Sequence, residues 1–476
     1  MPSNPLQTLL TQDPGLPNPN PTSAYWQSPS HPLSNTQSPT LVLTTDIAII
    51  GSGITGLSVL LTLLERHPDL KMTVLEARSL CSGATGRNGG QLAANAGEEY
   101  VHLVEEYGRE EAGKIVRFTF ENLRRMRELA RRFAREESEV QEVVKVRVFL
   151  EEAGFERFRR GVDALERDVP ELKGVYTVLE SEVLKRDYHL DGAGGALLPA
   201  GTLWPYRLVT KAFASLWEEY AQRLNIETQT PVTSIAFDGT NPSHPYILHT
   251  PRGCLHAKKV VHCTNGHAGH LLPGLRGAVY PFKGTMTVQD GGSTVPNRGG
   301  DLSWGFHYPV IYDKQSSRYA GGLYYLMQNA KTGHFFFGGE DTRVDHCLSA
   351  DDSRVEEGSI TQLQQKLPQF LGHDGPEQWR LISGWSGIMG FSGDGLPLVG
   401  RANAAMTTRH GEGEYVAAAF NGYGMANCLL AGEALAKIML DEDVSAWLPN
   451  AYGIHETRVT ELLAVDRVIK SFALDG

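Results

Sequence analysis

The hydrophobic positions of the chain first form a regular pattern at residue 46. "DIAII" (46–50) is an apolar run of strand length, and the glycine-rich turn "GSGITG" (51–56) follows it directly. Apolar residues then recur at the spacing of one helix face, at Ile54, Leu57, Leu61 and Leu64. "KMTVLE" (71–76) returns to a strand pattern. The pattern predicts a β-α-β unit over residues 46–76.

A second strand, glycine turn and helix occur late in the chain. "YVAAAF" (415–420) is an apolar strand, and "NGYG" leads into the helical stretch "MANCLLAGEALAKIML". Between the two units, residues 99–168 have a charged, helical rhythm, and strand and turn signals dominate from 192 to 345. No internal repeat is visible. Two α/β units therefore flank a long middle region.

The two ends of the chain differ from this body. Residues 1–40 are rich in Pro, Ser, Asn and Thr, which predicts an extended or disordered segment. Within it, the two aromatic residues of "SAYWQS" (23–28) offer an attachment to the body. Residues 448–476 are predicted to form a helical tail on the outside.

Composition narrows the class of protein. A net charge of −11 and a pI of about 5.8 disfavour a nucleic-acid partner. No apolar stretch approaches the roughly 18 to 20 residues of a membrane helix. The five cysteines contain no CxxC pair and the N-terminus lacks a signal-peptide pattern, which predicts free thiols and a cytoplasmic location.

The turn "GSGITG" has the glycine spacing of a dinucleotide-binding turn. Gly51 permits the tight turn, Gly53 lets a pyrophosphate approach the backbone, and Gly56 lets the helix pack close to the sheet. Glu76, at the end of the second strand, is placed to accept hydrogen bonds from an adenosine ribose. A lone motif is weak evidence, and an ordinary β-α-β turn is the alternative. With strand, helix and acid all in place, we expect dinucleotide binding.

The segment after Glu76 favours FAD over NAD. "ARSLCSGATGRNGGQL" (77–92) is a polar, glycine-rich loop able to follow an extended cofactor, with donors at Ser82, Thr85, Arg87 and Asn88. A flexible surface loop is the alternative. The late helix adds a second helix N-terminus, whose dipole would stabilise the negative charge of a reduced flavin. A nicotinamide has no such need.

Six segments in this order resemble the D-amino-acid-oxidase-like FAD-dependent oxidoreductases. The likeness is nearest to the branch with glycine/sarcosine oxidases and gamma-glutamylputrescine oxidoreductase, and there to fungal members. It extends from about Tyr25 to Asp443. The segments are "DIAIIGSGITG", "LEARSLCSGATGRNGGQL", "GTLWPYRLV", "VVHCTNGHAGHLLPGLRGAVYPFKGTM", "WSGIMGFSGDGLPLVG" and "AAFNGYGMANC".

The resemblance implies an α/β fold with a Rossmann-like FAD-binding domain, discontinuous in sequence, and a sheet-based α+β substrate domain. We expect the FAD-binding domain to comprise residues 41–100, 192–275 and 380–447. Residues 101–191 and 276–379 would then form the substrate domain.

The resemblance also implies which residues bind FAD. The pyrophosphate would contact Gly51, Ser52, Gly53, Ile54, Thr55 and Gly56, and the adenosine Glu76, Ala77, Arg78 and the backbone of Val232. The flavin side of the loop would add Ser82 with Ala84, Thr85, Gly86, Arg87, Asn88, Gly89, Gly90, Gln91 and Leu92. Thr264, Asn265 and Gly266 would return to the cofactor. The isoalloxazine would be surrounded by Asp394, Gly395, Gly422, Tyr423, Gly424 and Met425.

Two departures from the family pattern matter. Covalent relatives attach flavin through a cysteine in the segment matching "GIMGFSGDGLPLVG", which contains none, so we expect non-covalent FAD. Lys283 in "PFKG" stands where relatives often carry Arg, which puts substrate charge and oxygen reactivity at that position in doubt.

No catalytic residue is assigned. Candidates to line the substrate pocket are Lys283, Tyr324, Tyr325 and Trp385, with ordinary core aromatics and a surface lysine as the alternative. Asp394 is a catalytic acid or, more in keeping with turn chemistry, a loop acid that binds backbone N–H groups. "HCTNGHAGH" (262–270) is not expected to bind metal, because strand alternation separates its side chains.

The expected function is hydride transfer from a C–N bond of a small amine or amino acid to FAD, with O2 as the acceptor and H2O2 as product. Orientation and a neutral amine suffice for such chemistry. Two alternatives stay open. One is a dehydrogenase with another acceptor or a C–OH substrate, and the other is a non-catalytic flavin-binding or sensing protein.

Overall fold

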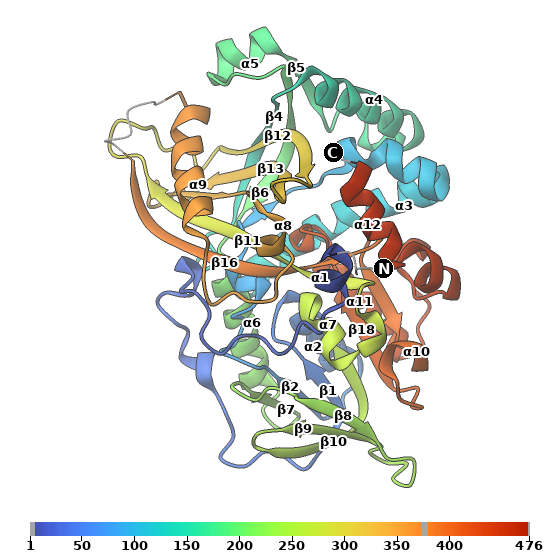
Figure 1. The fold of residues 1–476 in the computed structure, drawn as a ribbon. Coiled ribbons are helices and arrows are strands. Elements are labelled where there is room, and N and C mark those ends of the chain that lie inside the picture. Colours follow the sequence, from blue (N-terminus) through green and yellow to red (C-terminus); the bar gives the residue numbers. More distant parts are fainter. Residues whose placement is uncertain (1–4, 373–378, 475–476) are drawn as a thin grey trace.

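The structure, a computed structural model, describes residues 5–372 and 379–474, which form two β-sheets with helices around them (Figure 1). The first sheet has four neighbouring parallel strands: β10 (Gly253–His262), β1 (Thr44–Ile50), β2 (Met72–Leu75) and β7 (Leu224–Glu227). Beyond β10 it continues through β18 (Glu414–Ala418), also parallel, to the antiparallel β17 (Leu398–Arg401). β9 (Tyr246–Thr250) pairs antiparallel with β10, and β8 (Ser234–Phe237) pairs antiparallel with β9. The predicted β-α-β unit is present.

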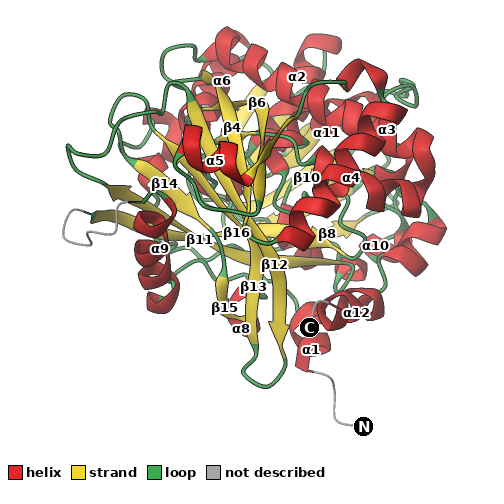
Figure 2. Cartoon of the chain, turned by 90° about the horizontal axis from the view of Figure 1, so that it is seen from above, coloured by secondary structure: helices red, strands yellow, loops and turns green. Residues whose placement is uncertain are grey.

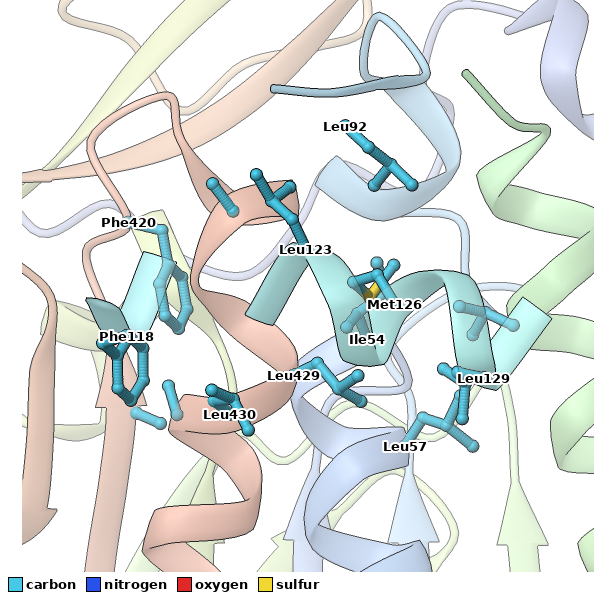
Figure 3. Packing of buried hydrophobic residues seen from close by; sticks show 14 of the residues in the cluster. Ile54, Leu57, Leu92, Phe118, Leu123, Met126, Leu129, Phe420, Leu429 and Leu430 are labelled. Carbon is cyan, nitrogen blue, oxygen red and sulfur yellow. The ribbon is translucent and has the colours of Figure 1, made fainter. Parts of the chain in front are cut away.

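Four helices pack together beside this sheet: α2 (Ile54–Arg66), α3 (Ala96–Phe133), α6 (Pro205–Glu219) and α11 (Cys428–Met439). Figure 3 shows where α3 meets α2 and α11, at Phe118, Leu123, Met126 and Leu129 of α3, Ile54 and Leu57 of α2, and Leu429 and Leu430 of α11. The two glycine turns are thereby brought together, because α2 and α11 each begin at one of them. Gly432 allows this close packing, since a Cβ there would lie 2.7 Å from the Thr55 carbonyl oxygen.

The second sheet is larger and mostly antiparallel. Its order is β16 (Arg380–Ser392), β11 (Val279–Asp290), β14 (Phe335–Gly338), β13 (Arg318–Gln328), β12 (Leu302–Asp313), β4 (Gln141–Phe149), β6 (Gly194–Thr202) and β3 (Gln91–Leu92). β15 (Asp341–Arg343) pairs with β13, and β5 (Thr177–Glu180) with β6. The helices α4 (Glu152–Asp168), α5 (Ser181–Tyr188) and α9 (Glu357–Phe370) pack on this sheet, and α9 lies away from α3 and α4 (Figure 2).

Aromatic packing under α9 closes one face of the larger sheet. Phe370 of α9 stacks on Phe306 of β12 with ring centroids 4.1 Å apart, and Tyr324 and Phe337 join the same cluster. This face is therefore core, and the opposite face is left to meet the first sheet. Three one-turn helices complete the body: α7 (Ala268–Leu271), α8 (Val344–Cys347) and α10 (Ala404–Thr407).

The structure differs from the expected boundaries at three strands. β3, β6 and β16, which fall within the expected ranges 41–100, 192–275 and 380–447, lie in the larger sheet and not in the sheet of the β-α-β unit. The alternation of apolar residues predicts that a strand forms but not which sheet it joins, because that depends on distant partners.

The N-terminal segment is also more ordered than its composition predicts. Residues 5–40 contain α1 (Pro5–Thr11) and two 3-10 turns, η1 (Tyr25–Gln27) and η2 (Pro32–Asn35). Trp26 is buried and stacks on Phe336 with ring centroids 3.9 Å apart, so burial of this indole overrides the polar composition. Residues 1–4 lie outside the described residues.

The C-terminal segment contains η9 (Asn450–Tyr452), η10 (Arg458–Leu462) and α12 (Val465–Leu474), and α12 contacts α1. Tyr452 and Arg458 are buried, so part of the predicted outer tail reaches the interior. Among the helices of residues 5–372 and 379–474, none is both long and apolar enough to cross a membrane.

Candidate cofactor and substrate site

A cavity of about 460 Å³ lies where the carboxyl ends of β1, β2 and β10 face the larger sheet. In open α/β sheets, ligands bind at this edge. The predicted cofactor residues that line it are Gly51, Ser52, Gly53, Ile54, Thr55, Glu76, Ala77, Arg78, Ala84, Thr85, Arg87, Asn88, Gly89, Gln91, Val232, Thr264, Asn265, Gly422, Tyr423, Gly424 and Met425. Segments almost four hundred residues apart thus meet in one space.

The turn after β1 is built from backbone and leaves room for a ligand. Gly51 has φ +109°, and a Cβ there would lie 2.5 Å from the Cys263 carbonyl oxygen. The Ile54 N–H donates to Thr85 Oγ1 at 3.1 Å, which ties the loop to the N-terminus of α2. The N-cap residue, Gly53, has no side chain of its own to cap the helix. A helix N-terminus of this kind attracts an anionic group such as a pyrophosphate.

Glu76 holds this turn and also borders the cavity. Its carboxylate accepts from the Ser52 N–H (3.1 Å), the Ser52 hydroxyl (2.7 Å) and the Arg78 N–H (3.0 Å). The Ser52 hydroxyl oxygen in turn accepts from the Cys81 N–H at 2.8 Å. The hydroxyl groups of an adenosine ribose can donate hydrogen bonds, and an acid fixed at the end of β2 is placed to accept them. The residues present therefore fit a dinucleotide.

The guanidinium groups of Arg78 and Arg87, in the loop of residues 77–92, are bonded to other groups of the protein. Arg78 Nη1 contacts both oxygens of Asp352, at 3.0 and 2.9 Å, and Arg87 Nε lies 3.6 Å from the same carboxylate. Arg87 also donates to the Ser386 carbonyl oxygen at 2.7 Å. Burial lowers the pKa of Arg87 to about 10. These guanidinium groups therefore fix the loop to the larger sheet and to the N-terminal segment, where Arg87 also reaches Thr22.

The turn before α11 is held by two asparagines. Asn122 of α3 donates to the Met425 carbonyl oxygen at 3.0 Å and accepts from the Leu430 N–H at 2.9 Å. Asn265 accepts from the N–H of Ala419, whose φ is +61°. A strained backbone is retained where its surroundings over-determine it, commonly at ligand sites. The turn that presents residues 422–425 to the cavity is thus rigid.

Several predicted cofactor residues do not line the cavity. Gly56 and Gly266 serve packing, because a Cβ would meet the carbonyl oxygens of Gly51 and Met389. Asp394 is buried against Arg458 (2.7 Å) and accepts from the Leu396 N–H, as a loop acid does. The others away from the cavity lining are Ser82, Gly86, Gly90, Leu92 and Gly395.

Of the four predicted pocket residues, Tyr325 borders the cavity. Tyr324, its neighbour on β13, points to the core under α9, where Gln362 donates to its hydroxyl at 2.6 Å. Trp385 donates from its indole N–H to the Arg87 carbonyl oxygen at 2.9 Å, and Lys283 Nζ lies 3.6 Å from Glu356. Successive residues of a strand point to opposite faces, and the sequence did not show which face was which.

Beyond the cofactor residues, the larger sheet adds an apolar wall. Its side chains come from β11, β13 and β16, namely Phe282, Met286, Tyr319, Leu323, Tyr325, Ile388, Met389 and Phe391. We call the part of the cavity along this wall the substrate compartment. Gly305 and Gly338 clear space on both sides of Tyr325, since each pairs with it in the sheet.

Two charged residues of this compartment were missed by the sequence reasoning, Lys145 and Glu340. Lys145 of β4 contacts Gln91 Oε1, and burial lowers its pKa to about 7. Its only sequence signal is the alternation of Lys145 and Arg147 in an apolar strand, which places two bases on one face. Glu340 follows the aromatic run "HFFFGG", and its signal is an acid directly after two glycines.

The N-terminal segment was also missed as part of the site. Gly15, Leu16 and Pro17 line the cavity, and the Gly15 carbonyl oxygen lies 3.1 Å from His267 Nδ1. Burial lowers the pKa of His267 to about 4, so the neutral ring is the form that donates this hydrogen bond.

The histidine-rich segment after β10 has its side chains dispersed. His262 is fully buried and lies 2.8 Å from Glu414, which also pairs with Arg409. Within residues 5–372 and 379–474, no group of three or more His, Cys, Asp or Glu side chains is arranged to hold a metal ion.

Comparison with known proteins agrees with this geometry. The family described as DAO, FAD dependent oxidoreductase, matches residues 46–438. The chain is 25% identical over 433 residues to gamma-glutamylputrescine oxidoreductase of Escherichia coli (strain K12), covering 88% of this chain and 89% of that one.

Solved structures share the fold. Glycine oxidase from Geobacillus kaustophilus has a TM-score of 0.66 at 19% identity, covering 87% of this chain and 99% of that one. L-Proline dehydrogenase from P. horikoshii has a TM-score of 0.59 at 18% identity, covering 87% and 97%. An oxidase and a dehydrogenase thus share one architecture.

Proposed function

Because the chain belongs to the DAO family of FAD-dependent oxidoreductases, we propose that it oxidises a C–N bond of a small amine or amino acid. FAD, when bound, supplies the hydride acceptor and passes the electrons to O2, giving H2O2. The imine left by the substrate hydrolyses. The first sheet with its turns would hold the cofactor, and the larger sheet would form the substrate domain.

The observation that carries the proposal is the composite cavity. At one end lie a turn built from backbone groups and Glu76, an acid placed to accept hydrogen bonds from a ribose. At the other end lies an apolar wall with few polar groups. A hydride leaves a carbon most readily where water is excluded and the donor is oriented, and an apolar wall provides both. The relatives whose names denote amine or amino-acid substrates point to the same C–N chemistry.

Non-covalent attachment is supported by the cysteines that border the cavity. Residues 387–391 of β16, which line it, include no cysteine. Cys263 and Cys428 do line it, but burial raises the pKa of both thiols, that of Cys428 to about 12. A covalent link requires a thiolate, which such thiols do not form at neutral pH.

The first test is an absorbance spectrum of the purified protein before and after acid precipitation. Flavin bands that move wholly into the supernatant are the expected result, and colour that stays in the pellet would overturn non-covalent attachment. A colourless protein that FAD cannot reconstitute would overturn the proposal itself.

The acceptor is tested on the same sample. After anaerobic reduction by an amine, exposure to air should restore the oxidised spectrum quickly and produce H2O2. Slow reoxidation would instead assign a dehydrogenase. If dithionite bleaches the flavin but no amine, amino acid or alcohol does, the protein is a flavin-binding protein without this activity.

A further inference from the structure

Glu340 is held at the edge of the substrate compartment by the end of a sheet ladder. The pairing of β11 with β14 stops at Met286 and Gly338, which leaves Thr285 without a partner on β14. Glu340 Oε1 accepts the Thr285 N–H. The Glu340 carbonyl oxygen accepts from the Gly321 N–H at 2.7 Å and from the Tyr308 hydroxyl at 3.1 Å. Its backbone and one carboxylate oxygen are therefore fixed.

The carboxylate of Glu340 has no ion-pair partner in residues 5–372 and 379–474, although the residue is 7% exposed. The charge of Lys283 acts on Glu340 and lowers its pKa, but Lys283 and Arg318 are ion-paired elsewhere. Lys283 pairs with Glu356 at 3.6 Å, and Arg318 donates to Asp341 at 2.6 Å. Burial raises the pKa of Glu340 to about 8. A buried acid of this kind gains most from a cation supplied by a ligand.

The other acids that border the cavity differ from Glu340. Glu76 is bonded to three donors of the cofactor turn, and Asp352 is paired with Arg78. The wall beside Glu340 is apolar, with Phe282, Tyr319 and Leu323. A cationic nitrogen beside Glu340 would favour its ionised form and pair with it, and that form would repel a ligand carboxylate. Lys145, the other charged group of the compartment, contacts Gln91 instead.

The position of Glu340 separates it from the place of oxidation. Gly338 pairs with Tyr325, and Tyr325 packs under the cofactor loop, where a Cβ on Gly89 would lie 2.8 Å from its ring. Glu340 lies two residues farther along the chain, which corresponds to roughly 7 Å in extended backbone. It is therefore beside the compartment rather than beside the cofactor loop.

Chemistry also argues for a nitrogen remote from the oxidised bond. An amine must be neutral for hydride to leave its α-carbon, whereas a nearby carboxylate stabilises the charged ammonium. An ionised Glu340 next to the reacting nitrogen would oppose the reaction. The same carboxylate beside a second nitrogen would bind the substrate without that penalty.

We propose that Glu340 binds a second, cationic nitrogen of the substrate, so that the compartment selects diamines or longer polyamines over simple amino acids. The inference rests on the proposed amine oxidation and names its substrate class. Glu340 is a specificity-determining residue in this assignment.

The test compares three ligands of one chain length: cadaverine, δ-aminovalerate and pentylamine. They end in an ammonium, a carboxylate and a methyl group, so that only the remote end differs. Anaerobic stopped-flow measurement of flavin reduction against ligand concentration gives the Kd and the limiting rate separately. Where a ligand does not reduce the flavin, its perturbation of the flavin spectrum gives the Kd.

We expect the protein to bind cadaverine about tenfold or more tightly than either of the other two. Glu340→Gln, which keeps an oxygen to accept the Thr285 N–H, should remove this preference and leave the Kd of pentylamine within about threefold. Glu340→Asp, which keeps the charge, should retain part of the preference. Asp345→Asn is the matched control, because Asp345 pairs with Arg343 outside the cavity lining, and it should bind as the unaltered protein does.

Equal weakening of cadaverine and pentylamine by Glu340→Gln would overturn the inference, as would the absence of any preference for cadaverine. The proposed function and the role of Glu340 are refuted by different results. Flavin reduction by pentylamine without a cadaverine preference would leave the proposed function standing and refute the role of Glu340. A preference for binding cadaverine, without flavin reduction by any amine, would support the role of Glu340 and refute the proposed function.

Discussion

The two ends of the cavity present different kinds of group to a ligand. At the turn after β1, contacts come from backbone groups and small residues, and the charge of Glu76 is matched by three donors. In the substrate compartment, Lys145 and Glu340 are buried with charged forms that their surroundings disfavour. The cofactor end is thus complete as the chain folds, whereas the compartment holds charges that a ligand can satisfy.

The largest effect is expected at the backbone end. Gly51→Ala places a Cβ 2.5 Å from the Cys263 carbonyl oxygen at a φ of +109°, so the turn must distort. We expect FAD affinity to fall by on the order of a hundredfold or more, measured by fluorescence titration of the apoprotein. Gly300→Ala, where a Cβ has open space, is the control and should bind FAD normally. Equal affinity in both variants would remove the turn from the cofactor site.

The second effect concerns the buried amine of Lys145. Its folded pKa of about 7 lies below its ordinary value of 10.5, so burial of the ammonium destabilises the fold fully below pH 7. This destabilisation fades as the pH rises from about 7 to about 10.5. Lys145→Met should therefore gain stability relative to the unaltered protein at neutral pH, by up to a few kcal/mol, and lose that gain at high pH. Denaturant unfolding across this range measures it, and a difference independent of pH would contradict the shifted pKa.

Glu340 should show the opposite dependence. Its folded pKa of about 8 lies above the ordinary 4.5, so the folded protein loses stability as the pH rises from about 4.5 to about 8. The melting temperature of Glu340→Gln should rise relative to that of the unaltered protein over this interval. Saturating cadaverine should shrink the difference, because the ligand supplies the missing cation. If the melting temperatures of the two proteins changed with pH in the same way, the carboxyl group of Glu340 would have its ordinary pKa.

The smallest effect is expected from the two thiols at the cofactor end. Cys263→Ser with Cys428→Ser should leave the FAD content and the acid-released fraction unchanged, because neither thiol is ionised. Flavin that becomes acid-releasable only in the double variant would show that one of these thiols forms a covalent bond.

The amino-acid sequence by itself determined the cofactor turn. The strand, the three glycines, the helix and Glu76 follow one another within about thirty residues, and their roles depend on local backbone geometry. The loop of residues 77–92 and the turn of residues 422–425 could be placed for the same reason, and the family pattern supplied the sheet-based second domain. Single residues within these segments, such as Gly86 and Leu92, were placed less well, because packing decides which of them line the cavity.

Tertiary structure alone decided the substrate compartment. Whether Tyr324 or Tyr325 borders it depends on the face that β13 turns toward the first sheet, and one step of register exchanges the two. Lys145 and Glu340 reach the same space from segments that are distant in sequence, and residues 15–17 join them where Gly15 is bonded to His267. Local spacing fixes what a segment becomes, but the side chains that meet in a cavity are chosen by the pairing of strands far apart in the chain.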